Sequence, residues 1–287
     1  MNKIGIHALV WAGSWGAREC EYTVASSKEA GYDLVEFPVF QPAAMDIEAI
    51  QRALSANGMT TTCSLGLSFD KDINSEDPAC VARGEALLHD ALMAARDLGS
   101  PYLGGVIFSA LGPYSEMPTE RSRQNSIAAI RRLAEKAAPL GITISLEFVN
   151  RYESNLLNTT AQTVDFIAEV GLPNVVVHAD SYHMNIEEND FRTPIVAAGD
   201  KIGYVHIGEN HRGYLGSGHV NFPQLFAALV EIGYKGTITF ESFSSAVVDE
   251  DLSKILRIWR NVWTDGMDLA KQARGYIATQ MEAAAQG

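Results

Sequence analysis

Basic residues and long apolar runs are both scarce in this sequence. The 287 residues contain 22 Lys and Arg against 35 Asp and Glu, which gives a net charge of −13. A surface of this charge repels phosphate backbones and anionic lipids, so nucleic acid is not an expected partner. No apolar run approaches the roughly 18 residues of a membrane span, and the N-terminus lacks the pattern of a secretory signal. We therefore expect a cytoplasmic protein that does not enter membranes.

Cysteines are also few, and they lack the spacing of a structural site. Cys20, Cys63 and Cys80 are odd in number and form no CxxC pair, so neither a disulfide framework nor a thiolate zinc site is expected. No Gly is followed by Lys, which excludes a P-loop. No linker rich in Pro or Ser divides the chain. One domain spanning residues 1–287 is the economical prediction.

Short β-rich runs alternate with longer stretches of helical period along the whole chain. The predicted strands are 3–11, 33–40, 60–67, 101–108, 143–149, 175–180, 202–208 and 236–242, and the predicted helices between them are 21–31, 46–58, 80–99, 120–141, 160–171 and 221–233. Several of these helices end in Gly, which is typical of a C-cap. Eight such units predict an α/β fold, a single (β/α)8 TIM barrel, with an open doubly wound sheet as the alternative.

The last part of the chain, residues 251–287, is long enough for the eighth helix and a C-terminal extension. Trp259 and Trp263 lie four residues apart in it. On a helix this spacing places both indoles on one face. We expect the pair to pack against the barrel or against a second subunit.

Two glutamates interrupt strands that are otherwise apolar on one face. In ITISLEFV, Glu147 shares its parity with Thr143 and Ser145, and the alternating positions are apolar. Side chains of a barrel strand point alternately inward and toward the helices, so Glu147 is expected to point inward. TITFES repeats this pattern and predicts a second inward glutamate, Glu241.

Asp180 and His206 extend this inward set to four consecutive strands. Glu147, Asp180, His206 and Glu241 are separated by 33, 26 and 35 residues, each about one βα unit. Each lies near the C-terminal end of its strand, where barrel enzymes keep their chemistry. Three carboxylates in one layer repel unless a cation holds them, so the pattern indicates a divalent metal site. Oxygen ligands with one imidazole favour Mn²⁺, Mg²⁺ or Co²⁺. The alternative for each residue alone is a core polar group satisfied by its neighbours.

Histidines cluster near these strands: five of the seven lie between residues 178 and 219. His183, Arg212 and Glu153 each follow a strand end by a few residues, in loops that would cover the same cavity. They could hydrogen-bond a polar ligand there, or they could be ordinary solvated loop residues.

Over nearly its whole length the chain resembles the ketose 3-epimerase family, the group of D-tagatose, D-allulose (psicose) and L-ribulose 3-epimerases among the xylose isomerase-like barrels. The segments that carry the resemblance are MNKIGIHALVWAGSW, SLEFVNRYE, HADSYHMNIEE, HIGENHRGYLGSGHVNF and TFESF. The resemblance implies that Glu147, Asp180, His206 and Glu241 bind the metal, usually Mn²⁺ or Co²⁺. It further implies free ketoses as substrates and a homodimer or homotetramer.

The same resemblance implies roles for the remaining candidates. Glu147 and Glu241 would exchange the proton at C3 through a cis-enediolate, and Glu153, His183 and Arg212 would hold the substrate around O1 to O3. The family often has an aromatic residue where this chain has His7, a position expected to face the distal end of the sugar. Epimerisation needs a base on each face of the carbon, and strands five and eight stand on opposing sides of a barrel.

Three rival functions follow from the same residues. An aldose–ketose or hydroxypyruvate isomerase on this barrel would move a proton between C1 and C2. An endonuclease IV-like repair enzyme uses a related barrel, but the net charge of −13 disfavours it. A non-catalytic sugar-binding protein would not need two opposed carboxylates.

Overall fold

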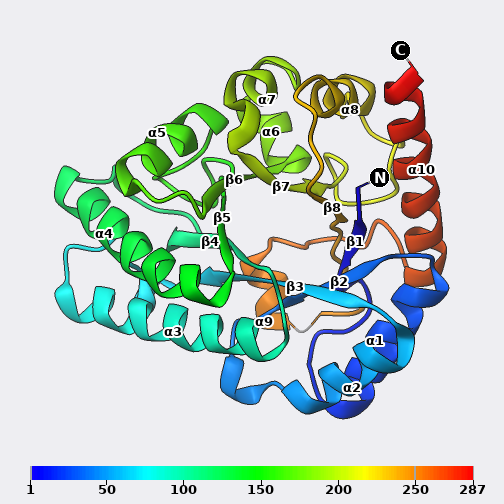
Figure 1. Cartoon of the computed structure of the whole chain (residues 1–287), viewed down its shortest axis with the longest axis horizontal. Coiled ribbons are helices and arrows are strands. Elements are labelled where there is room, and N and C mark those ends of the chain that lie inside the picture. The colour runs from blue at the N-terminus through cyan, green and yellow to red at the C-terminus, as the bar shows by residue number, and fades with distance from the viewer. Residues whose placement is uncertain (1, 249, 287) are drawn as a thin grey trace.

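The computed structural model describes residues 2–248 and 250–286. Its strands are β1 (Ile4–His7), β2 (Leu34–Pro38), β3 (Thr60–Leu67), β4 (Tyr102–Ala110), β5 (Thr143–Glu147), β6 (Val175–Asp180), β7 (Ile202–Ile207) and β8 (Thr237–Phe240). Neighbouring strands pair in parallel, and β8 pairs with β1 to close the barrel. Helices surround this barrel (Figure 1). The predicted TIM barrel is confirmed, and the open-sheet alternative is wrong.

The helices lie in the predicted intervals between strands, and two short helices that were not predicted follow β6. They are α1 (Ala17–Glu29), α2 (Ile47–Asn57), α3 (Pro78–Asp97), α4 (Glu120–Ala137), α5 (Thr160–Val170), α6 (Ser181–Glu187), α7 (Thr193–Ala198), α8 (Phe222–Glu231), α9 (Glu250–Ile255) and α10 (Gly266–Gln286). Short 3₁₀ turns occupy Ala8–Val10, Pro42–Ala44, Phe69–Lys71, Ala138–Leu140 and Gly199–Lys201. The sequence did not predict α6 and α7, because helices of six or seven residues carry little periodic signal.

Local sequence fixes where several helices begin and end. Thr119 and Thr159 each form a capping box at the start of α4 and α5, so their side chains satisfy amide groups that have no partner within the helix. Gly58 and Gly171 end α2 and α5 in the left-handed region, with φ of 60° and 74°. A side chain would strain this backbone, which explains the terminal glycines.

The core follows the predicted parity. Ile144 and Leu146 of β5 are fully buried in the main apolar cluster that joins the barrel to its helices. The polar residues of the opposite parity form a second, buried polar layer inside the barrel, where the hydroxyl of Tyr204 lies 2.7 Å from Oγ1 of Thr62 and 2.8 Å from Oγ1 of Thr239. Cys20, Cys63 and Cys80 are buried and unpaired, as expected.

The C-terminal segment differs from its prediction. Residues 256–265 are not helical, so Trp259 and Trp263 do not form the expected helical pair. Trp263 is buried and donates its indole N–H to Ser242 Oγ at 2.7 Å, whereas Trp259 is 69% exposed. Asp265 caps the next helix by accepting from the amides of Met267 and Asp268, which starts α10 only at Gly266.

The long helix α10 follows the barrel and packs beside α8 and the end of α1 (Figure 1). The hydroxyl of Tyr32 donates to the carbonyl of Ala270 at 2.9 Å, which ties α10 to the start of β2. None of the helices in the described ranges combines the length and the apolarity needed to cross a membrane.

Candidate metal and catalytic site

Four predicted residues meet at the C-terminal end of the barrel. Glu147 and Asp180 are the last residues of β5 and β6, His206 lies one residue before the end of β7, and Glu241 follows β8 directly. All four are buried, and each offers a ligand atom within 4.8 Å of the others. The period of two in each strand turns these side chains inward, and the closure of the barrel brings them together.

His206 lies between the two glutamates. Its Nδ1 is 3.4 Å from Oε1 of Glu147 and 3.5 Å from Oε1 of Glu241. This Nδ1 is buried and has no hydrogen-bond partner among the described residues. An unpaired nitrogen surrounded by carboxylates is the arrangement expected of a metal-ligating imidazole.

Burial and neighbouring carboxylates raise the pKa of Glu147. Burial, followed by repulsion from Glu241 and Asp180, raises this pKa from 4.5 to about 8, although the charge of His206 acts in the opposite direction. Burial alone would lower the pKa of His206, but Glu36, Glu241 and Glu147 raise it well above its usual range. The cluster therefore requires positive charge, either as protons or as a bound cation.

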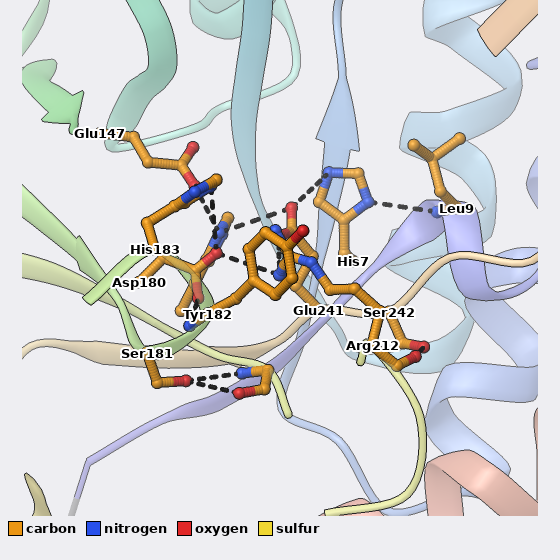
Figure 2. A network of polar contacts seen from close by, with 12 residues as sticks. His7, Leu9, Glu147, Asp180, Ser181, Tyr182, His183, Arg212, Glu241 and Ser242 are labelled. Atoms are coloured by element: carbon orange, nitrogen blue, oxygen red, sulfur yellow. Dashed lines mark hydrogen bonds and ion pairs between the residues drawn. The ribbon is translucent and has the colours of Figure 1, made fainter. Parts of the chain in front are cut away.

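Arg212 supplies part of that positive charge. Its Nη1 lies 2.7 Å from Oε2 of Glu241 and 3.0 Å from Oδ2 of Asp180 (Figure 2). The guanidinium also stacks over Tyr182, with 3.9 Å from its carbon to the ring centroid. The backbone of Arg212 has a left-handed φ of 59°, a strained conformation for a residue with a side chain. The chain thus bears strain that aims this cation into the site.

His183 approaches the cluster from α6, just beyond β6. Its Nδ1 accepts a hydrogen bond from the backbone N–H of Asn150 at 3.1 Å, which leaves the proton on Nε2. That Nε2 lies 3.6 Å from Oδ2 of Asp180 and 3.8 Å from Oε1 of Glu147. Asn150 also donates its side-chain N–H to Oε1 of Glu153 at 2.8 Å. One asparagine therefore orients both His183 and Glu153.

His7, the last residue of β1, lies beside Glu241 in the same site. Its Nδ1 accepts from the amide of Leu9 at 3.3 Å, and its Nε2 is 3.9 Å from Oε1 of Glu241 (Figure 2). Burial lowers the pKa of His7 to about 4, so the ring is neutral near pH 7. A neutral ring with Nδ1 as acceptor carries its proton on Nε2, which makes His7 a hydrogen-bond donor toward the cavity.

These residues line a common cavity of about 60 Å³ at the mouth of the barrel. Its polar wall includes His7, Glu147, Glu153, His183, Arg212 and Glu241. A wider chamber of about 490 Å³ lies outside it and shares Glu153, Arg212, Phe243 and Leu256 with the inner cavity. Glu153 and Arg212 reach the cavity from loops, as predicted, whereas His183 lies in helix α6 and not in a loop. Asp180 and His206 do not line this cavity, but they group with Glu147 and Glu241 beside it.

Glu36, Asn150 and Tyr182 belong to the site but were not predicted from the sequence. Glu36 is 1% exposed, and its Oε2 accepts from Nε2 of His206 at 2.9 Å. It interrupts the apolar strand LVEFP in the way that Glu147 interrupts β5, so the same signal was present in the sequence. Asn150 and Tyr182 follow strand ends and carry no comparable signal. His178 is a further inward residue, and it forms an overlapping group with Glu147 and His206.

The donor set fits a divalent cation. Three carboxylates and one imidazole nitrogen are ligands that hard or borderline metal ions accept. The second ring nitrogen of His206 is held by a carboxylate, as is usual for histidines that bind metals. The residues that could hold a divalent ion together are Glu147, Asp180, His206 and Glu241.

Known proteins are similar to this chain in both sequence and fold. Residues 24–273 match the model of the xylose isomerase-like TIM barrel family. The chain is 48% identical over 281 residues to the ketose 3-epimerase of Arthrobacter globiformis, with 98% of this chain and 97% of the relative covered. It is 46% identical to the L-ribulose 3-epimerase of Mesorhizobium japonicum, with 99% and 96% covered.

A solved structure agrees with the barrel in detail. The D-allulose 3-epimerase from Methylomonas sp., in complex with D-allulose, superposes with a TM-score of 0.96 at 47% identity, and 97% of each chain is covered. The superposition thus covers nearly the whole chain. The chain therefore belongs to the ketose 3-epimerase family of xylose isomerase-like TIM barrels, and it is an isomerase.

Proposed function

We propose that this chain epimerises free ketoses at C3 by proton exchange between Glu147 and Glu241. The observation that carries the proposal is that these two buried carboxylates come from β5 and from the end of β8 and line one cavity. Placed on opposite sides of a bound sugar, one carboxylate removes the C3 proton and the other returns a proton to the opposite face. An epimerase needs this pair, whereas a sugar-binding protein does not.

We further propose that Glu147, Asp180, His206 and Glu241 hold a divalent ion, Mn²⁺ in preference to Co²⁺ or Mg²⁺. The ion would supply positive charge next to the substrate ketone and so favour loss of the neighbouring proton. Arg212 already contacts Asp180 and Glu241, so it adds to the positive field of the site. A cation bound beside Glu147 would favour its ionised form, which is the form that can accept the C3 proton.

The substrate contacts follow from the groups on the cavity wall. Glu153 and His183 are oriented by Asn150, and with Arg212 they present one carboxylate and two donors to O1 to O3 of the sugar. His7 presents its Nε2–H near the distal end. The relatives are named for ketose, L-ribulose and D-psicose as substrates. We therefore propose D-fructose, D-allulose, D-tagatose and L-ribulose as the panel that contains the substrate.

The test is an NMR assay of that panel in D₂O with the Mn²⁺-loaded protein. Deuterium at C3 together with the 3-epimer supports the proposal. Deuterium at C1 with an aldose product supports the alternative, an aldose–ketose or hydroxypyruvate isomerase on the same barrel. Binding without any exchange would support a sugar-binding protein. A sample treated with EDTA is the matched control, and unchanged turnover in it would contradict the metal.

The remaining predictions from the sequence concern assembly and location. We propose a homodimer or homotetramer in the cytoplasm, with a small ketose as the ligand and neither nucleic acid nor membrane as a partner. The net charge of −13 supports the exclusion of nucleic acid. Light scattering at several protein concentrations measures the oligomeric state.

A further inference from the structure

Glu36 of β2 is a buried carboxylate for which the proposed reaction has no role. It is 1% exposed and lies in the polar layer directly beneath the candidate metal site. Its Oε2 accepts hydrogen bonds from Nε2 of His206 at 2.9 Å and from the hydroxyl of Tyr204 at 2.7 Å. Among the described residues, no Lys or Arg forms an ion pair with it. A buried carboxylate is costly, so its contacts with the histidines need an explanation.

We propose that Glu36 is a positioning residue that sets the orientation of both His206 and His7. The inference rests on the proposed metal site, and it assigns to Glu36 a function that the four ligands do not have. By accepting from Nε2 of His206, Glu36 fixes which nitrogen carries the proton in that ring. The other nitrogen, Nδ1, then faces Glu147 and Glu241 with its lone pair available to a cation.

The second oxygen of Glu36 faces the wall of the cavity. Oε1 has no hydrogen-bond partner among the described residues and lies 3.9 Å from Nε2 of His7. His7 and Glu36 are paired in register between β1 and β2, so their backbones hold this spacing. The amide of Leu9 already donates to Nδ1 of His7, which leaves the Nε2–H between Glu36 and Glu241. One buried anion therefore lies next to a metal ligand and next to a candidate substrate contact.

The strands around Glu36 hold it rigidly. The hydroxyl of Tyr204 that donates to it is itself in contact with Thr62 of β3 and Thr239 of β8. The hydroxyl that holds this carboxylate is thus itself fixed by contacts to two further strands, which limits the rotation of Glu36. Such outer partners of metal-ligating histidines typically contribute about 10-fold to 100-fold in metal affinity.

The experiment compares Glu36→Gln with Tyr204→Phe and with a matched control, Tyr32→Phe. Glu36→Gln keeps the shape of the side chain and removes its charge. Tyr204→Phe removes one donor to Glu36 and leaves the charge. Tyr32→Phe removes an equally buried hydroxyl that bonds to Ala270, remote from the site. The measurements are Mn²⁺ affinity by calorimetry, the imidazole N–H signals of the Mg²⁺-loaded protein by NMR, and kcat at saturating Mn²⁺.

We expect Glu36→Gln to weaken Mn²⁺ binding about 10-fold to 100-fold and to move the N–H signal of His206 upfield. Saturating Mn²⁺ should restore kcat to within a few-fold of wild type, because Glu36 does not touch the substrate. Tyr204→Phe should weaken binding less, and Tyr32→Phe should not weaken it. Unchanged affinity and an unchanged N–H signal in a folded Glu36→Gln protein would overturn the inference.

Two further outcomes are distinguishable. If Glu36→Gln does not fold, Tyr204→Phe decides: weaker Mn²⁺ binding supports the inference, and wild-type binding overturns it. If wild-type protein binds no divalent ion, the proposed metal site fails, and the imidazole signals of the metal-free protein still test the inference. In that case an unchanged His206 signal in Glu36→Gln overturns it.

Discussion

Nη1 of Arg212 lies 2.7 Å from Oε2 of Glu241, on a side chain that is aimed into the site by a left-handed backbone turn. The same nitrogen lies 3.0 Å from Oδ2 of Asp180. A loop residue whose side chain is only 14% exposed thus becomes the cation that partly balances two buried carboxylates. Its contribution to stability and its contribution to substrate binding can be separated by substitution.

Arg212→Lys and Arg212→Met should differ in stability and agree in substrate binding. Lys keeps the charge but loses the planar stack on Tyr182, whereas Met loses both. We expect kcat/KM to fall about 100-fold in both variants, because the sugar is misplaced. The free energy of unfolding in EDTA should fall in the Met variant and remain close to wild type in the Lys variant. Wild-type KM in Arg212→Met would contradict the assigned contact.

Replacing either proposed base should stop turnover and leave metal binding largely intact. Glu147→Gln and Glu241→Gln each keep an oxygen as a metal ligand but cannot accept a proton. We expect kcat to fall about 10²-fold to 10⁴-fold in each. Exchange into D₂O measures the activity, and calorimetry with Mn²⁺ measures the metal. Normal turnover in either variant, or complete loss of metal in both, would disprove the two-base assignment.

The titration of Glu147 should make its contribution to the stability of the metal-free protein fall as the pH rises from about 5 to about 8. Burial and neighbouring carboxylates raise the pKa of Glu147 from 4.5 to about 8 in the folded state. Between these values the folded state holds a proton that the unfolded state has released, so unfolding is favoured as pH rises. The measurement is urea unfolding in EDTA, with Glu147→Gln as the variant that lacks this titration.

The difference in unfolding free energy between wild type and Glu147→Gln should therefore change across this pH range, to the disadvantage of wild type. Saturating Mn²⁺ should remove the effect, because a bound cation stabilises the ionised carboxylate. A difference that is independent of pH would show that Glu147 titrates normally.

His7 should affect the choice of substrate without a pH dependence of its own. Because burial lowers its pKa to about 4, it stays a neutral donor from pH 6 to pH 8. His7→Phe removes this donor and should cost about fivefold to tenfold in kcat/KM for a ketose whose hydroxyl it contacts. His7→Gln retains a donor and serves as the control. The ratio of kcat/KM for D-fructose to that for L-ribulose should change in the Phe variant. An unchanged ratio would place His7 outside the sugar contacts.

The two tryptophans near the C-terminus should differ sharply in stability. Trp263 is 4% exposed and bonds to Ser242, so Trp263→Ala should cost about 3 to 5 kcal/mol in unfolding free energy. Trp259 is 69% exposed, and Trp259→Ala should change stability by about 0.5 kcal/mol or less. Urea unfolding of both variants makes the comparison. Equal losses would mean that Trp259 is covered in solution, as in an interface between subunits.

The sequence alone was sufficient for the architecture and for the direction of the key side chains. Alternation of strands and helices predicted the barrel, and a period of two predicted that Glu147 and Glu241 point inward. The positions of strands and helices and the inward direction of a strand side chain are both local properties. Strand parity and helix caps depend on residues that are neighbours in the chain. The same local signal was present at Glu36, but parity does not say which inward residues touch.

Which side chains of the site contact one another was decided only by the tertiary structure. Closure of the barrel pairs β1 with β8 and brings His7 next to Glu241, although 234 positions separate them. The left-handed turn at Arg212 and the hydrogen bonds from Asn150 to His183 and Glu153 depend on loops that fold against one another. Residues 256–265 form turns and bends, and Trp263 is buried against the barrel, so tertiary packing overrides the helical spacing of the two tryptophans. The sequence determined which groups face the interior, and the closed barrel determined which of them lie within reach of a common cation.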